Sequence, residues 1–502
     1  MMMFDWTHKR ARLSGDKTAI LDPMGNRELS YRQLDERASR LAEVFMRRYG
    51  LQPGERVAML CQHSAEFYEA LFACAKAGLI LVPMNWRLAV AEQEFVLRDC
   101  EPKLLIFDGV YAEAAQALEA SLGIPALGFG EGEPDFESAL AEASGEPVIM
   151  PARQQDEPWY LIYTSGTTGK PKGVVQTLGM ALVNYLDIGV PSNLTAEDVS
   201  LNLLPQFHVG GINLYTLPTL IVGGTAIILR SFEPELTFKL LAERVTVFFG
   251  VPAVYLMLIQ HPEFKSTDFS RVRVWASGGA PLPVRIIEDY ADYGIRIRQG
   301  FGMSETGPTV FLIDSERAID KAGSVGMPQL FIETRIVDEQ ERDVATGQAG
   351  ELLVRGPSVT PGYWNLPEKT AESFTQDGWF RSGDIARCDA DGYYYIVDRS
   401  KDMYISGGEN VYPAEVENVI YEHPAVAETA VIGVPDERWG EVGLAVVVRR
   451  TGEALEAEEL LRFCKARLAG YKVPKRVEFM DALPRNAGGK VVKPALRERF
   501  GG

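Results

Sequence analysis

The chain has 502 residues, of which 46% are hydrophobic and 24% charged, a composition typical of soluble globular proteins. This length corresponds to roughly two to four domains and permits a large core without disulfides or structural metals. The net charge of −18 excludes the broad basic surface of a nucleic-acid-binding protein.

Short apolar segments alternate with amphipathic segments up to about residue 400. In the first amphipathic segment, Ser30 and Gln33 predict a capping box, and apolar side chains follow at helical spacing, at Leu34, Ala38, Leu41 and Phe45. Buried strands are predicted at 56–60, 79–82, 103–107, 225–229, 245–249 and 271–275. This alternation indicates an α/β fold with largely parallel sheets.

The pattern changes near residue 400. Loop-rich stretches at 356–364 and 378–384 precede a compact run, in which a helix beginning at Pro413 and a helix at 456–468 enclose strands at 430–434 and 444–448. This run predicts a small α+β domain of about 100 residues. We therefore expect an N-terminal domain at 1–398, a hinge at 399–402 and a C-terminal domain at 403–502.

Segment 209–229 has no charged residue and is long enough to span a membrane. It contains several glycines and a proline, so a buried helix followed by a buried strand is expected instead. The first residues have no apolar signal core, and the five cysteines include no CxxC pair. These features predict a cytoplasmic protein with reduced thiols and no transmembrane segment. The sequence does not decide whether the protein contacts a membrane peripherally or forms a homodimer.

The strongest local pattern is the segment Tyr163-Thr-Ser-Gly-Thr-Thr-Gly-Lys-Pro-Lys-Gly173, which follows an apolar strand at 159–163. Its glycines allow backbone N–H groups to approach an anion, while its hydroxyls and lysines suit phosphate oxygens. It is not a Walker loop, because Gly169-Lys170 is followed by Pro171 instead of Ser or Thr. The pattern therefore predicts a phosphate-binding loop of another kind.

This loop resembles the signature of the adenylate-forming superfamily, which contains acyl-CoA synthetases, peptide-synthetase adenylation domains and beetle luciferases. Further segments resemble the family's motifs in the same order, at 205–211, 277–281, 299–306, 378–384, 398–402, 406–413 and 484–493. The resemblance covers essentially the whole chain and is nearest to short fatty-acyl-CoA synthetases. It implies a large N-terminal domain of two α/β sheet subdomains plus a small β-barrel, followed by a small mobile α+β C-terminal domain.

The resemblance also implies a nucleotide site for ATP. Phe301 would face adenine, Ser304 would bond the α-phosphate and Asp384 the ribose hydroxyls, while Glu305 offers a hard oxygen ligand for Mg²⁺. The family usually has Tyr and Thr where this chain has Phe301 and Ser304, so one hydroxyl is missing. The implied nucleotide-binding set is Thr164, Ser165, Gly166, Thr167, Thr168, Lys172, Gly279, Ala280, Gln299, Phe301, Gly302, Ser304, Asp384 and Arg399.

The C-terminal motifs imply the remaining chemistry. Lys490 corresponds to the family's catalytic lysine, and Lys401 to the pivot between the domains. Gly407 and Gly408 correspond to the tunnel that admits the pantetheine arm of coenzyme A.

The motif at 205–211 corresponds to the acyl pocket, with His208 as the aromatic gate. It contains no carboxylate, so the ammonium group of an amino acid would stay unpaired there. A neutral apolar acyl group is expected, with Gly210 and Gly211 leaving room for it. The implied pocket set is Val209, Gly210, Gly250, Gly278, Gly300 and Pro308.

The sequence thus predicts an AMP-forming acyl-CoA synthetase that uses ATP, Mg²⁺ and coenzyme A to activate a medium- or long-chain fatty acid. An aryl acid–CoA ligase of the coumarate, ferulate or benzoate type is the alternative, and a luciferase-like oxygenase a more distant one. A non-catalytic adenylate-binding protein is disfavoured, because Glu305, Asp384, Arg399 and Lys490 are all retained. The sequence has no GxSxG elbow or GxGxxG fingerprint that would favour a hydrolase or a dehydrogenase.

Overall fold

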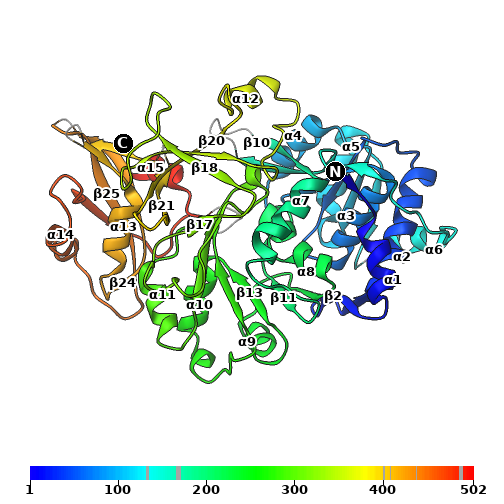
Figure 1. Ribbon diagram of the computed structural model, residues 1–502, viewed down its shortest axis with the longest axis horizontal. Helices are drawn as coiled ribbons and strands as arrows, with labels where there is room; N and C mark the ends of the chain where they lie inside the picture. Colours follow the sequence, from blue (N-terminus) through cyan, green and yellow to red (C-terminus); the bar gives the residue numbers. More distant parts are fainter. Residues whose placement is uncertain are drawn as a thin grey trace.

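The computed structural model describes residues 1–131, 135–165, 171–399, 402–406, 409–436, 438–485 and 490–501. For Ser165, Arg399 and Asn410 only the backbone is described. The chain runs from the N-terminal part on the right of Figure 1, through a central part, to the C-terminal part on the left. The parts therefore follow one another in space in the order of the sequence.

The first sheet has the strand order β10-β9-β5-β4-β6-β7. Its strands from β9 to β7 are parallel, and β10 is added antiparallel to β9. The bounds are β4 (Arg56–Leu60), β5 (Ile80–Met84), β6 (Leu104–Asp108), β7 (Ala126–Phe129), β9 (Pro158–Ser165) and β10 (Pro171–Thr177). Every residue of β5 and β6 is buried, as expected for parallel strands covered on both faces.

The second sheet has the order β17-β16-β15-β14-β13-β11-β12-β2-β3. The strands from β2 to β15 are parallel, so their carboxyl ends lie along one edge of the sheet. The bounds are β2 (Thr18–Asp22), β3 (Arg27–Ser30), β11 (Val199–Asn202), β12 (Thr225–Ile228), β13 (Val247–Gly250), β14 (Val274–Ser277), β15 (Ile297–Phe301), β16 (Phe311–Leu312) and β17 (Met327–Pro328). The strands predicted from apolar segments are confirmed, with bounds shifted by up to three residues.

The helices of the N-terminal part include α2 (Tyr31–Glu43), whose predicted capping box between Ser30 and Gln33 is present. The others are α1 (Trp6–Ser14), α3 (Ala65–Ala77), α4 (Val90–Cys100), α5 (Ala112–Leu122), α6 (Asp135–Glu142), α7 (Leu178–Asn184), α8 (Thr216–Val222), α9 (Pro234–Glu243), α10 (Pro252–Gln260), α11 (Val284–Ala291) and α12 (Pro367–Glu372). Two π-helical turns, η3 (Tyr185–Gly189) and η4 (Gly210–Leu214), follow α7 and precede α8.

The uncharged stretch at 209–229 forms η4, α8 and β12, so the predicted buried helix and strand are confirmed. In the part of the chain that the structure describes, no helix is long and apolar enough to cross a membrane.

A third, antiparallel sheet has the order β18-β19-β20-β21 and occupies the place of the expected small barrel. Its strands are β18 (Glu333–Val337), β19 (Gly350–Arg355), β20 (Phe380–Cys388) and β21 (Tyr394–Arg399). Segment 378–384, predicted to be loop-rich, is mostly strand, because Phe380 and Arg381 pair with Val354 and Leu353 of β19.

The C-terminal part contains β22 (Tyr404–Ser406), β23 (Glu409–Val411), β24 (Val426–Asp436), β25 (Gly440–Arg449) and β26 (Arg476–Phe479). They form one sheet, packed with α13 (Pro413–Tyr421), α14 (Ala457–Lys465) and α15 (Lys493–Phe500). The predicted α+β composition after residue 400 is confirmed.

Candidate active site

Two of the predicted motifs and one predicted pocket residue meet at the carboxyl ends of neighbouring parallel strands. Gly250 at the end of β13 lies opposite Ser277 of β14, and Ser277 lies opposite Gln299 of β15. Ser277 Oγ and Gln299 Oε1 are buried and have no hydrogen-bond partner among the described residues. Ligands of open α/β sheets bind at such strand ends. Gln299 belongs to β15, and β16 pairs with the last two residues of that strand, Gly300 and Phe301.

The next turn is shaped by glycine. A Cβ atom on Gly302 would lie 1.5 Å from the carbonyl oxygen of Pro308, so a side chain at this position is impossible. Gly279 has a φ of +80°, which favours glycine, and it is followed by Ala280 beyond the end of β14. Both segments bring the backbone close to the strand ends. The ring of Phe301 lies 6.0 Å from the ring of Phe311. Phe301 is half-buried, so part of its surface is exposed beside the site.

The phosphate-binding loop connects the antiparallel strands β9 and β10. Thr164, near the end of β9, lies directly opposite Lys172 of β10. Thr164 Oγ1 is buried and has no hydrogen-bond partner in the described ranges. The loop's two ends therefore present an unsatisfied hydroxyl and a lysine side by side.

Glu305 is held by two groups from different segments. The Nζ of Lys172 lies 3.0 Å from Glu305 Oε1, and the hydroxyl of Tyr363 donates to the same oxygen at 2.9 Å. Lys172 Nζ also donates to the Tyr363 hydroxyl at 2.6 Å. Burial, and then the charge of Glu305, raise the pKa of Tyr363, so this hydroxyl stays protonated and donates. Tyr363 was not found from the sequence, because its contact with Lys172 spans 191 residues.

Glu305 suits a magnesium ion. It is a hard oxygen ligand, and both hydrogen bonds that the described residues make to its carboxylate use Oε1. No group of three or more potential metal-binding side chains occurs among the described residues. A Mg²⁺ ion held mainly by substrate phosphates needs only one or two carboxylates, so this donor set fits.

The turn that carries Glu305 is fixed by its backbone. Gln176 donates to the carbonyl oxygen of Ser304 at 2.7 Å, and the Thr360 amide donates to that of Glu305 at 2.8 Å. The side chain of Asn213, in η4, donates to the Gly307 carbonyl at 2.6 Å. The residue that directly follows the predicted metal-binding motif is therefore bonded to η4, the turn that begins within the predicted acyl motif.

Asp384 and Arg399 lie opposite each other in β20 and β21. Asp384 is buried, and its amide donates to the hydroxyl of Ser382 at 3.0 Å. The two residues that the resemblance assigns to the ribose thus come from paired strands. The side chain of Arg399 is outside the described part.

His208 is set beside Phe207, with the ring centroids 4.8 Å apart. Burial, and then the positive charges of Lys490 and Arg87, lower the pKa of His208 to about 4, so the imidazole is neutral near pH 7. Its Nε2 is buried and has no hydrogen-bond partner among the described residues. The predicted gate histidine and the predicted catalytic lysine therefore lie close enough to interact.

Three of the predicted pocket residues, Gly210, Gly278 and Gly300, lie beside one apolar cluster. A Cβ on Gly278 would lie 3.3 Å from the ring of Phe249, one on Gly300 would lie 3.5 Å from Leu312, and one on Gly210 would lie 3.4 Å from Leu204. These side chains belong to a single cluster, of Ile188, Leu194, Leu204, Leu214, Tyr215, Val222, Val247, Phe249, Val274, Ala276 and Leu312. We call it the inner cluster. Sequence reasoning missed Phe249, although it directly precedes Gly250.

Two glycines differ from expectation. A Cβ on Gly211 would lie 2.1 Å from the Pro205 carbonyl, so this glycine permits a tight backbone turn and makes no room for a substrate. A Cβ on Gly250 would face Phe248 and Tyr255, which pack in a neighbouring cluster. Val209 is buried, and Pro308 follows Gly307 through a cis peptide bond.

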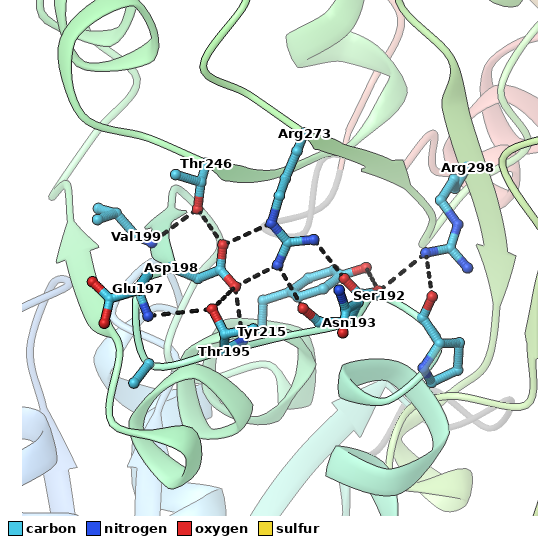
Figure 2. A network of polar contacts seen from close by, with 12 residues as sticks. Ser192, Asn193, Thr195, Glu197, Asp198, Val199, Tyr215, Thr246, Arg273 and Arg298 are labelled. Carbon is cyan, nitrogen blue, oxygen red and sulfur yellow. Dashed lines mark hydrogen bonds and ion pairs between the residues drawn. The ribbon is translucent and has the colours of Figure 1, made fainter.

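A polar network holds Tyr215, one residue of the inner cluster, in place (Figure 2). The hydroxyls of Ser192 and Tyr215 are 3.1 Å apart, and Arg298 donates to Ser192 Oγ at 3.2 Å. In the same network, Arg273 and Thr246 both donate to Asp198, at 2.9 and 2.7 Å. The ring of Tyr215, fixed in this way, lies 6.2 Å from the ring of Phe249. Both rings therefore have a set place within the cluster.

Several predicted residues lie outside the described part of the chain: Gly166, Thr167, Thr168, Lys401, Gly407 and Gly408, together with the side chain of Ser165. Their assignments stay predictions. Lys490 is described and exposed.

Comparison with known proteins defines the class. Residues 7–364 match the family model of the AMP-binding enzymes, and residues 415–490 match that of the AMP-binding enzyme C-terminal domain. The chain belongs to the AMP-binding enzyme family, and within it to the AMP-forming CoA ligases, for which ATP, coenzyme A and a small carboxylic acid are the substrates.

Two relatives match over nearly their whole length. The chain is 44% identical to a feruloyl-CoA synthase from Amycolatopsis sp over 499 residues, 99% of this chain and 98% of the relative. It is 40% identical to an indoleacetate–CoA ligase from Aromatoleum aromaticum over 503 residues, again 99% and 98%.

Among solved structures, ATP-bound MatB from Rhodopseudomonas palustris superposes with a TM-score of 0.91, at 34% identity and 99% coverage of both chains. Apo MatB, with the same identity and coverage, gives a TM-score of 0.80. The present structure is therefore more similar to ATP-bound MatB than to apo MatB.

Proposed function

We propose that this CoA ligase activates an aromatic carboxylic acid. The observation that carries the proposal is the inner cluster, in which the ring of Phe249 lies behind Gly278 and the ring of Tyr215 lies 6.2 Å from that of Phe249. Flat rings pack well against such aromatic walls. The 44% and 40% identities to enzymes named for ferulate and indoleacetate support the same choice. The sequence ranked a fatty acid first, on the uncharged motif at 205–211 and on the resemblance to short fatty-acyl-CoA synthetases.

The reaction has two half-reactions. In the first, a carboxylate oxygen attacks the α-phosphate of ATP, and pyrophosphate leaves. In the second, the thiol of coenzyme A attacks the acyl carbonyl of the adenylate, and AMP leaves. The protein acts in the first mainly by positioning and by stabilising negative charge on the phosphate oxygens.

The predicted roles of the residues follow from this chemistry. Lys172 and Lys490 bring positive charge to the phosphates, and Asp384 accepts hydrogen bonds from the ribose. Glu305 would hold the Mg²⁺ ion, which supplies charge neutralisation on the phosphates when bound. Neutral His208 would border the acyl carbonyl without adding a charge to an apolar pocket.

The proposal also includes the boundary between the two domains and the cellular location of the protein. The third sheet ends with β21 at Arg399 and the C-terminal sheet begins with β22 at Tyr404, which supports a hinge at 399–402. The five free cysteines, four of them buried, support a cytoplasmic location.

The test is a substrate panel. AMP release dependent on both acid and coenzyme A is measured with ferulate, coumarate, benzoate and indole-3-acetate, and with fatty acids of increasing length. We expect the highest kcat/KM for an aromatic acid. A higher value for a medium- or long-chain fatty acid would overturn the aromatic assignment. Light emission without formation of an acyl-CoA thioester would identify the luciferase-like oxygenase instead.

A further inference from the structure

Tyr363 connects the two charged side chains on which the first half-reaction depends. It accepts a hydrogen bond from Lys172 at 2.6 Å and donates one to Glu305 at 2.9 Å, and its ring lies 3.8 Å from the Lys172 ammonium. Tyr363 is 6% exposed, so water competes little for these contacts. A buried hydrogen bond to a charged group is stronger than one between neutral groups.

The backbone holds Tyr363 where it can make both contacts. Val174 and Tyr363 form an antiparallel bridge, flanked by hydrogen bonds from the Val175 amide to the Gly362 carbonyl and from the Trp364 amide to the Gly173 carbonyl. The segment 360–364 thus adds a short pairing to the outer edge of β10, the strand that carries Lys172. The same segment binds the backbone of Glu305 through Thr360.

We propose that Tyr363 is a positioning residue, which sets the distance between the carboxylate that binds the divalent cation and the lysine that binds the phosphates. By donating a hydrogen bond to Oε1, it orients the Glu305 carboxylate so that Oε2 points away from Tyr363. By accepting a hydrogen bond from Lys172, it gives the ammonium a second contact, in addition to the direct ion pair with Glu305. The lysine is thus kept beside the carboxylate by two groups. This inference rests on the proposed function, because it assigns Tyr363 to the ATP-consuming half-reaction.

A matched control exists in the same chain. Tyr393 is 5% exposed, its hydroxyl donates to the Asp314 carboxylate at 2.7 Å, and Lys321 lies 5.2 Å from its ring. Its environment therefore resembles that of Tyr363, but none of its partners belongs to the predicted site. Tyr393→Phe removes an equivalent buried hydrogen bond and reports what such a loss does to the fold alone.

The experiment compares Tyr363→Phe with Tyr393→Phe. Binding of Mn²⁺ is measured by electron paramagnetic resonance in the presence of α,β-methylene-ATP, which needs no turnover. We expect Tyr363→Phe to weaken Mn²⁺ binding about tenfold, the size of one lost hydrogen bond to a charged group, and to raise the Mg²⁺ requirement of pyrophosphate release similarly. Thioester formation from preformed adenylate and coenzyme A should stay within about twofold, and Tyr393→Phe should leave all three quantities unchanged.

A double-mutant cycle with Glu305→Gln separates a positioning role from a general one. If Tyr363 acts through Glu305, adding Tyr363→Phe to Glu305→Gln should weaken Mn²⁺ binding no further. Unchanged Mn²⁺ binding in Tyr363→Phe, additive effects in the cycle, or equal losses in both tyrosine variants would each overturn the proposal. If the wild type forms no acyl-adenylate with any acid, the proposed function fails, but the Mn²⁺ measurement still judges Tyr363.

Discussion

Lys490 and His208 lie within electrostatic reach of each other, although one belongs to the C-terminal part and the other to the predicted acyl motif of the N-terminal part. The C-terminal lysine is therefore next to the N-terminal site, in a structure that is more similar to ATP-bound than to apo MatB. In that arrangement Lys490 is available to the adenylation half-reaction.

We therefore predict that Lys490→Ala slows adenylate formation and spares the second half-reaction. The developing charge on the phosphate loses its cationic partner, and losing one such contact typically costs about 10²–10³-fold in rate. Single-turnover pyrophosphate release and thioester formation from synthetic acyl-adenylate are measured separately. Lys465→Ala, at an exposed lysine of α14, is the control. Equal slowing of both steps would mean that the lysine serves both.

Glu305→Gln tests the metal assignment, since it keeps the shape of the side chain and removes its charge. We expect about 10²–10³-fold slower adenylation at limiting Mg²⁺. Glu316→Gln, at an exposed position, should behave as the wild type. Mg²⁺ titration of pyrophosphate release provides the measurement, and a Glu305→Gln rate within a few-fold of wild type would remove this residue from the metal site.

Gly210 and Gly211 should respond in opposite ways to the same substitution. Gly211→Ala would place Cβ 2.1 Å from a backbone carbonyl, and such overpacking costs about 1–3 kcal/mol or more. Gly210→Ala would make only ordinary contacts, at 3.4 and 3.5 Å, with the side chains of Leu204 and Leu214. We expect the midpoint of thermal unfolding to fall for Gly211→Ala and to be preserved for Gly210→Ala. A preserved midpoint in both variants would contradict the close contact at Gly211.

Stability should decrease in mild acid because of buried histidines. Burial lowers the pKa of His63 from 6.5 to about 4, while its Nδ1 lies 2.7 Å from the Leu229 carbonyl oxygen. The unfolded state therefore binds the proton more tightly. The stability gained by keeping the ring neutral is complete above about pH 6.5 and is lost as the pH falls toward 4, by up to about 1.4 kcal/mol per pH unit.

His63→Gln isolates this contribution. The variant should lose less thermal stability than the wild type between about pH 7 and pH 5, because its side chain does not titrate. The difference between the two proteins cancels the other titrating groups. Parallel pH profiles would show that His63 does not contribute.

Local signals were sufficient for much of the fold. The Ser30–Gln33 capping box and the buried strands β4 and β5 depend on neighbouring residues, and the sequence indicated them correctly. Segment 378–384 was misplaced, since its strand pairing comes from a distant partner, β19. Glycine and serine content predicted turns there, and tertiary pairing overrode it.

The candidate site shows the same division. Its individual motifs were recognisable, because each combines residue types that suit one chemical task. Tyr363 was not, since a lone tyrosine after a proline–glycine turn has no local signal for its contacts with Lys172 and Glu305. Gly211 was misread for a related reason: whether a missing side chain makes room for substrate or for backbone depends on a carbonyl six residues earlier, at Pro205.

The carboxylate of Asp398, at the end of β21, accepts a hydrogen bond from the Ala414 amide at 2.9 Å and so caps the first turn of α13 across the predicted hinge. A rotation about residues 400 and 401 separates the two sides of that bond. The Ala414 amide would then lose its acceptor and exchange its hydrogen with solvent faster. Deuterium uptake at this single amide therefore reports the orientation of the C-terminal domain. It can be measured in the unmodified enzyme as each substrate is added.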